Sequence, residues 1–291
     1  MKSIKLIIIL TFTAFNLFSQ NITNTLGTSR VFTIKDASTN YFSLSQISGN
    51  LSLNRSPVLQ PTTSSTIGVI FKGSQRFLHD YGNANTFLGV NSGNFTMTGF
   101  FNTALGYQSL FSNTTGNFNT SVGLNSLYSN ATGYENTAVG LQSLYRNYLG
   151  NNNTAVGINS LYNNNDDENT AIGSYSLYTN STGSCNTALG SQSLYLNNNG
   201  FDNTAVGWQS LYSNTTGNFN SALGYQSLYS NNIGYENTAV GLQSLFTNNN
   251  GNYNTAVGSA SLFKNISGSQ NTAVGYYSFE NNWFNDPVFN K

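Results

Sequence analysis

Residues 136–145 read Asn-Thr-Ala-Val-Gly-Leu-Gln-Ser-Leu-Tyr, and close copies of this decapeptide recur from Asn85 onward. The copies follow one another every 17 residues, except for one interval of 16. A short, fixed period of this kind is typical of solenoids, in which each repeat buries its apolar side only against its neighbours. We call each repeat a rung and number its positions from the leading Asn, which stands at Asn85, Asn102, Asn119, Asn136, Asn153, Asn169, Asn186, Asn203, Asn220, Asn237, Asn254 and Asn271.

The consensus of one rung is N-T-A-V-G-x-Q-S-L-Y-x-N-x-T-G-x-x, which favours two short strands over a helix because Gly, Asn, Ser and Thr are frequent. Pro is absent between Pro61 and Pro287, as a ladder of stacked strands requires. The sequence therefore predicts an all-β fold, a single-stranded β-solenoid or β-roll of twelve 17-residue rungs.

Two apolar columns are the predicted core. Position 4 is always aliphatic and position 9 is Leu in ten rungs, so we expect both to point inward and to face each other across a thin interior. Gly at positions 5 and 15, for example Gly140 and Gly150, is expected to provide the positive φ angles of two tight corners.

An aromatic residue follows the Leu of position 9 in ten rungs. Because successive side chains of a strand point to opposite faces, the residue after an inward Leu should point outward. An aromatic stripe ten rungs long would expose more contiguous apolar area than is usual for a soluble monomer. We expect a homo-oligomer contact or a ring folded back over its own rung, with an exposed ligand platform as the alternative. This candidate interface or ligand stripe comprises Phe111, Tyr128, Tyr145, Tyr162, Tyr178, Tyr195, Tyr212, Tyr229, Phe246 and Phe263.

Three further columns are regular. Asn at position 1 and Thr at position 2 can form hydrogen bonds along the solenoid axis. A Thr column could also order water as ice-binding solenoids do, but that would call for a second Thr column, and position 4 is aliphatic. Ala at position 3 is small enough to let neighbouring chains approach closely.

The N-terminal residues of the chain predict that the protein is exported. In residues 1–20, Lys2 and Lys5 precede an apolar run that ends near Ser19, which is the pattern of a secretory signal peptide. We therefore expect a secreted or outer-surface protein, and no other stretch has the length of a membrane-spanning helix once the signal is cleaved.

The chain after the signal peptide divides into a segment without the repeat and the repeat domain. Residues 21–84 lack the repeat and carry predicted strands at Val31–Lys35, 41–46 and 67–71, so we expect a small N-terminal β cap or neck, with a partly ordered linker as the alternative. The repeat domain is expected at residues 85–284, followed by a C-terminal tail at 285–291.

Charge and chemistry exclude several function classes. Charged residues make up 7% of the chain and balance to zero, which disfavours nucleic-acid binding. His79 is the only His, and with Asp80 alone it makes no catalytic triad, so we expect no catalysis and no cofactor. The acidic cluster at residues 163–168, in the short rung, is expected to be a solvated turn, with cation binding as a weaker alternative.

A longer repeat overlies the short one. Residues 134–144 match residues 235–245 without a difference, which indicates that a block of six rungs was duplicated. Adjustable length is typical of a spacer or a multivalent surface, and it is unlike an enzyme with one unique site.

The run N-T-A-V-G-x-x-S-L, for example Asn237 to Gly241 followed by Ser244, resembles the head repeats of YadA-like trimeric autotransporter adhesins. The resemblance covers Asn85 to about Asn282. It implies a left-handed parallel β-roll, a homotrimer with apolar faces between chains, and attachment to a host, matrix or glycan surface. The rung is longer than the usual head repeat, so the corners must differ.

No stretch after Asn271 resembles the stalk and membrane anchor of that family, so we expect either a fragment or an exported protein held by a partner. The expected function is that of an adhesin-like structural repeat protein without catalysis. The alternatives are a passive surface spacer or fibre protein without a ligand, and a carbohydrate-active or ice-binding β-solenoid.

Overall fold

The computed structural model describes residues 31–35, 40–45, 51–53, 62–65 and 68–280. The chain divides into two compact units, Met1–Leu59 and Gln60–Lys291. The predicted signal peptide at residues 1–20 and the predicted tail at 285–291 lie outside the described residues. The described ranges are built from strands and turns without a helix, and so contain no helix that could cross a membrane.

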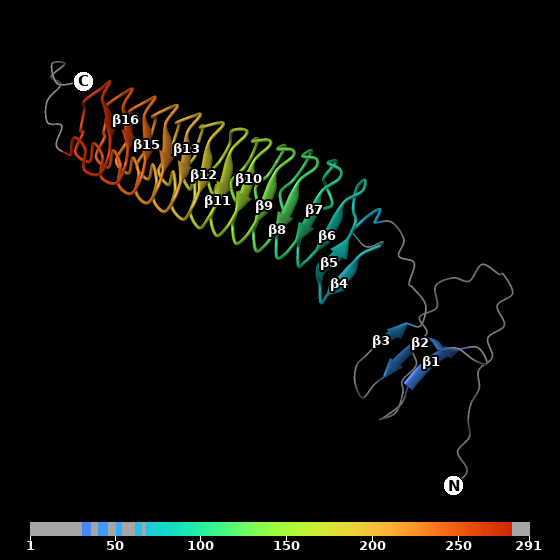
Figure 1. Ribbon diagram of the computed structural model, residues 1–291. Coiled ribbons are helices and arrows are strands. Elements are labelled where there is room, and N and C mark those ends of the chain that lie inside the picture. Colours follow the sequence, from blue (N-terminus) through green and yellow to red (C-terminus); the bar gives the residue numbers. More distant parts are fainter. Residues whose placement is uncertain (1–30, 36–39, 46–50, 54–61, 66–67, 281–291) are drawn as a thin grey trace, which may run out of the picture. The chain divides into compact units, whose positions relative to one another are not determined.

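The first unit contains a three-stranded antiparallel sheet in the order β1-β2-β3, drawn in blue in Figure 1. Its strands are β1 (Val31–Lys35), β2 (Asn40–Ser45) and β3 (Leu51–Leu53). The strand predicted at Val31–Lys35 is confirmed, and the one predicted at 41–46 lies one residue earlier. The sequence did not predict β3.

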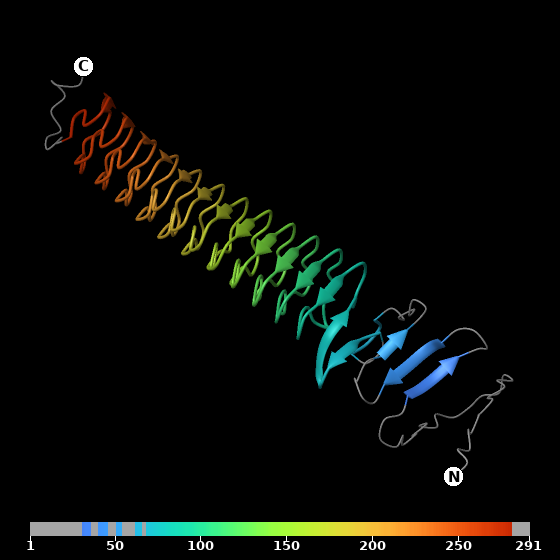
Figure 2. The same ribbon diagram turned by 60° about the horizontal axis from the view of Figure 1, so that its bottom comes forward.

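The second unit is a β-solenoid, as predicted, and its sheet has fourteen strands. The hairpin of β4 (Ile70–Lys72) and β5 (Gln75–His79) is antiparallel and joins the first rung strand, β6 (Thr86–Leu88), also antiparallel. From β6 onward all neighbours are parallel and each rung adds one strand (Figures 1 and 2). The remaining strands are β7 (Thr103–Leu105), β8 (Thr120–Val122), β9 (Thr137–Val139), β10 (Thr154–Val156), β11 (Thr170–Ile172), β12 (Thr187–Leu189), β13 (Thr204–Val206), β14 (Ser221–Leu223), β15 (Thr238–Val240), β16 (Thr255–Val257) and β17 (Thr272–Val274).

Each rung has one strand, so the prediction of two strands per rung is wrong. After the strand the backbone turns left-handed at positions 7 and 9, with φ of 53° at Gln142 and 48° at Leu144. The rungs nevertheless stay hydrogen-bonded there, since the Leu144 N–H donates to the Ser160 carbonyl at 3.0 Å. The second side of the solenoid is therefore a stack of turns.

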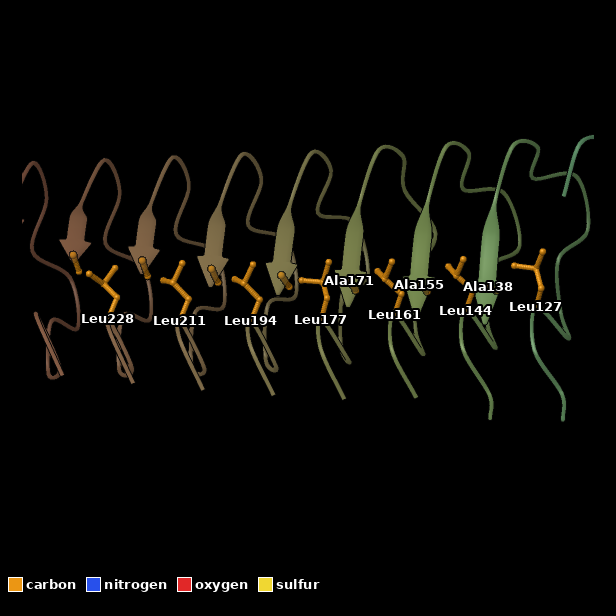
Figure 3. Close-up of a cluster of buried hydrophobic side chains, with 14 of the residues drawn as sticks. Leu127, Ala138, Leu144, Ala155, Leu161, Ala171, Leu177, Leu194, Leu211 and Leu228 are labelled. Carbon is orange, nitrogen blue, oxygen red and sulfur yellow. The ribbon is translucent and has the colours of Figure 1, made fainter. Parts of the chain in front are cut away.

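The apolar core consists of Ala at position 3 and Leu at position 9, which point toward each other along the interior (Figure 3). Ala155 and Leu161 are both fully buried. The inward prediction is confirmed for position 9 but is wrong for position 4, where Leu105 and Ile172 are exposed. A three-residue strand turns positions 2 and 4 to one face and position 3 to the other, and the small Ala fits the narrow interior.

The rest of the interior is polar. Asn at position 1 forms the predicted axial ladder: the Asn136 N–H donates to Oδ1 of Asn119 at 3.0 Å, and its Nδ2 to the Gly150 carbonyl at 2.8 Å. A second ladder at position 12 was not predicted, and there Asn147 Nδ2 donates to Asn130 Oδ1 at 2.9 Å. Both columns are buried and satisfied, so they stabilise the stack without a ligand.

The two Gly columns have different causes. Position 5 has the predicted positive φ, for example 134° at Gly140. Position 15 does not, so that part of the prediction is wrong. A Cβ at Gly183 would lie 2.3 Å from the Gly200 carbonyl oxygen, which shows that close stacking of neighbouring rungs requires Gly there.

The β5 strand takes the place of a preceding rung for the first one. The Asn91 N–H donates to the Arg76 carbonyl at 3.0 Å, a bond that a preceding rung supplies elsewhere. The Ser92 carbonyl accepts from Nε2 of His79 at 2.9 Å and from Nε of Arg76 at 3.3 Å. Backbone groups that would otherwise be unpaired at this end of the stack are thereby satisfied.

Candidate functional site

The aromatic residues of position 10 form a continuous stack along the solenoid. Neighbouring ring centroids lie 5.2 Å apart at Tyr128 and Tyr145, and 5.1 Å apart at Tyr195 and Tyr212, where the ring planes differ by only 4°. The stack joins all ten predicted residues, from Phe111 to Phe263. The structure thus brings the whole predicted stripe together.

The stacking decides what this column can offer a ligand. Each inner ring has a neighbour on both faces and is half-buried. Burial, together with the adjacent tyrosine, raises the pKa of the Tyr195 and Tyr212 hydroxyls above the ordinary value. The column therefore presents ring edges and the tyrosine hydroxyls, and between its ends it lacks the open ring face on which a flat apolar ligand stacks.

The outer face of the parallel strands carries the second candidate surface, which sequence reasoning missed. Thr at position 2 and an aliphatic residue at position 4 alternate outward, in register from rung to rung. Position 4 is exposed in six rungs, for example 45% at Leu105, 44% at Ile172 and 50% at Leu223, and half-buried in the other six. In the described residues, the position 2 hydroxyls make no hydrogen bond to the protein.

Position 6 extends this surface beyond the Gly of position 5. It carries exposed apolar side chains in most rungs, including Leu141, Ile158 and Trp208. Trp208 and Tyr225 stack with ring centroids 4.9 Å apart. We call positions 2, 4 and 6 together the strand face. The alternation of Thr and aliphatic residues is the sequence signal that could have identified it.

Charge is excluded from the strand face. From Asn85 to Phe279 every charged residue lies at positions 11 to 17. We call this part of the rung, which follows the aromatic residue of position 10, the far corner. These residues are Glu135, Arg146, Asp166, Asp167, Glu168, Asp202, Glu236 and Lys264. An uncharged, partly apolar strip twelve rungs long therefore runs beside a polar corner.

The carboxylates of Asp166 and Asp167 accept hydrogen bonds from within the cluster and from Asn151 of the preceding rung. Asp167 Oδ1 accepts from the Asn151 N–H at 2.7 Å and from its Nδ2 at 3.0 Å, while Asp166 Oδ1 accepts from the Asp167 N–H at 2.9 Å. Within the described ranges, no three His, Cys, Asp or Glu side chains are grouped so that they could hold a metal ion.

His79 is a packing residue of the β5 hairpin. Its ring lies 4.8 Å from the rings of Phe87 and Phe95, and it is 3% exposed. Burial lowers the pKa of His79 below its ordinary value. Asp80 is engaged elsewhere, accepting from the Thr62 N–H at 2.8 Å, so the two neighbours do not form a catalytic pair.

The chain was also compared with known proteins. The comparisons with protein-family models, with curated proteins and with solved structures each find no match.

Proposed function

We propose that this chain is a secreted or cell-surface adhesin-like repeat protein, without catalytic activity, that assembles into a homotrimer through its strand face. The support for assembly is the strand face itself, since monomeric proteins seldom leave a contiguous apolar strip of this length in water. The resemblance of the rungs to trimeric adhesin heads supports the number of chains.

The distribution of charge supports the same face. The central parts of protein interfaces are depleted in charged residues, and the strand face has none in any rung. Its three-residue strands stack in register, so equivalent side chains of a second copy would meet a regular surface. The Ala column, which the sequence suggested for contacts between chains, is buried in the core of its own chain.

The evenness of the solenoid supports attachment. Equivalent positions recur on all rungs, so a weak contact made by one rung can be made by many, and several weak contacts add to a strong one. The alternative of a passive spacer shares this architecture. Binding of the purified chain to arrays of glycans, matrix proteins and whole cells separates the two, because a spacer would bind none of them.

The assembly is tested by charge placed on the strand face. Ile172→Asp combined with Leu223→Asp should dissociate the trimer, because the carboxylates would be buried between chains. Thr182→Asp combined with Thr216→Asp adds the same charge at exposed position 14 and should leave the trimer intact. Equal behaviour of the two double variants in light scattering would contradict the proposed interface.

A specific observation also favours a second candidate, a water-ordering or ice-binding face. Thr hydroxyls and aliphatic methyl groups both point outward from the in-register strands, and the hydroxyls have no protein partner in the described residues. This function requires the strand face to be open to solvent. Thermal hysteresis that disappears in Thr154→Asp would favour it, whereas its absence in the wild-type chain would exclude it.

A further inference from the structure

The one short rung interrupts the solenoid at its far corner. In neighbouring rungs, the N–H groups of positions 13 and 14 both donate to one carbonyl of the next rung, as Ser181 and Thr182 do to Asn198. In the fourth rung the Tyr148 N–H instead donates to the Asn165 side chain at 3.0 Å. Among the described residues, the backbone bonds of positions 13 and 14 are missing on both sides of the short rung, while those of position 11 remain, as from the Arg146 N–H to the Tyr162 carbonyl at 2.9 Å.

This interruption coincides with a hollow of about 360 Å³. Arg146 and Tyr148 line it from the fourth rung, Asn163 and Asn165 from the short rung, and polar side chains of the next two rungs complete it. The volume falls in the range of small-molecule sites, roughly 300–1,000 Å³. The missing residue has therefore produced a concave surface where the other rungs stack without a break.

Arg146 is the distinctive group of the hollow. Its guanidinium carbon lies 5.9 Å from the centroid of the Tyr162 ring, and Nη1 makes only a long 3.5 Å contact with Asn163 Oδ1. No carboxylate of the described residues pairs with it. Arg146 and Lys264 are the only cations of the rungs, and Lys264 occupies the same position 11 outside the hollow.

The surrounding side chains match a hydroxyl-rich ligand. Asn163, Asn165 and Asn198 each offer an amide donor and an amide acceptor, and Thr179 and Ser181 add hydroxyls. Tyr148 is 48% exposed at the rim and provides an apolar ring. A guanidinium pairs with a carboxylate through two parallel hydrogen bonds, which fixes the orientation of the ligand as well as its charge.

We infer that this hollow binds a saccharide that carries a carboxylate, such as a uronic acid, with Arg146 pairing the carboxylate and the amides contacting the hydroxyls. The inference rests on the proposed attachment function and gives it a ligand class. The rim residue Tyr148 is exposed, so we expect one copy to bind weakly and an assembly of several chains to bind a polymer of such sugars more tightly.

The test uses the full chain and trigalacturonate, with its fully methylated ester as the matched ligand that keeps the hydroxyls but lacks the charge. Wild-type protein should bind trigalacturonate in calorimetry or ligand-observed NMR, and should bind the ester at least tenfold more weakly. Arg146→Gln should weaken trigalacturonate binding at least tenfold, since a hydrogen bond to a charged group is lost.

Lys264→Gln is the matched control, because it removes a cation from the same position outside the hollow, and it should leave binding unchanged. Inserting Gly after Asp166 restores the full rung length and should abolish binding while Arg146 remains. The inference is overturned if the wild-type protein does not bind trigalacturonate, or if it binds the ester equally well. It is also overturned if Arg146→Gln leaves the trigalacturonate affinity unchanged or if Lys264→Gln lowers that affinity as much as Arg146→Gln does. Trigalacturonate binding that survives the Gly insertion would overturn it as well.

These outcomes are separable from the proposed function. A wild-type protein that is trimeric and attaches to cells but does not bind trigalacturonate would overturn the inference about the hollow alone. A monomer that binds trigalacturonate through Arg146 would overturn the proposed assembly and leave the site in place.

Discussion

Leucine at position 9 combines an unfavourable backbone with a fully buried side chain. Its left-handed φ, 47° at Leu161, costs about 1–2 kcal/mol for a residue with a Cβ. Burying a Leu side chain gains about 1.5–3 kcal/mol, which offsets this strain. The side chain of Leu161 is 0% exposed, so the backbone angle is the means by which a turn points Leu into the core.

Truncating this side chain should therefore weaken the solenoid. We expect Leu161→Ala to lower the free energy of unfolding by about 2–5 kcal/mol, because a cavity would remain in a thin core. Asp at Leu144 or Leu161 should unfold several rungs, since a charge would be buried.

Val156→Thr, on the outward side of the same rung, is the control and should change the unfolding free energy by less than about 0.5 kcal/mol. Urea denaturation followed by circular dichroism measures both variants. Equal losses at Leu161 and Val156 would contradict the assignment of position 9 to the core and position 4 to the surface.

The sequence predicted some residue positions and not others for a physical reason. Leu at position 9 was correctly placed inside because it is large and apolar. Position 4 was placed inside for the same reason, although Ala at position 3 is the buried residue of the strand. Hydrophobicity alone favours the larger side chain, whereas the available interior volume selects the smaller one.

At the scale of elements, the Asn ladders replace much of the apolar core. Asn180 Nδ2 donates to Asn164 Oδ1 at 2.7 Å and to the Gly183 carbonyl at 2.6 Å, and its Oδ1 accepts from Asn197. The period of the sequence suggested the ladder at position 1. The ladder at position 12 was missed because an Asn in a turn is equally typical of solvent-exposed loops.

Removing one ladder residue should leave several buried groups unpaired. We expect Asn180→Ala to destabilise the solenoid by at least about 2 kcal/mol, because each orphaned buried group costs about 1–3 kcal/mol. Asn199→Ala, at an exposed corner, should have little effect on the same thermal or urea transition. Similar midpoints for the two variants would argue against a stabilising ladder.

The Gln column at position 7 contains a correctable gap. Gln209, Gln226 and Gln243 each donate to the Gln one rung earlier at 2.7–3.0 Å. Asn125 stands in this column with a buried Oδ1 that has no partner. Asn125→Gln should allow a new side-chain contact with Gln108 or Gln142, the position 7 residues of the adjacent rungs, and stabilise the protein by about 0.5–1.5 kcal/mol, measured as a higher urea midpoint. A lower midpoint would show that the shorter side chain fits this rung better.

The β4–β5 hairpin should respond to pH through His79. The neutral ring donates from Nε2 to Ser92 and accepts at Nδ1 from the Tyr81 N–H. Burial lowers the pKa of His79 in the folded protein, so its contribution to stability is present above the unfolded value of about 6.5 and is lost as the pH falls below it.

Amide exchange in β5 and β6 should therefore be faster at acidic pH than the intrinsic rate predicts. His79→Phe keeps the ring between Phe87 and Phe95 and should remove this pH dependence. Protection of β5 that is independent of pH in the wild-type chain would contradict a role for the His79 proton.

Along the whole solenoid, each side of the rung has a separate role. The interior is closed by Ala, Leu and Asn columns, the charged residues lie at the far corner, and the strand face is uncharged and exposed in the single chain. The 17-residue period of the sequence was sufficient to predict the solenoid fold. Which side faces outward depended on the left-handed backbone angles at positions 7 and 9, which the consensus does not reveal.

The most direct test of the central claim is the solution mass of the chain from Gln20 to Lys291, measured by light scattering after size exclusion. We predict the mass of three chains, because the strand face needs a partner surface. A single-chain mass at all concentrations would contradict it and would show that the strand face is open to water.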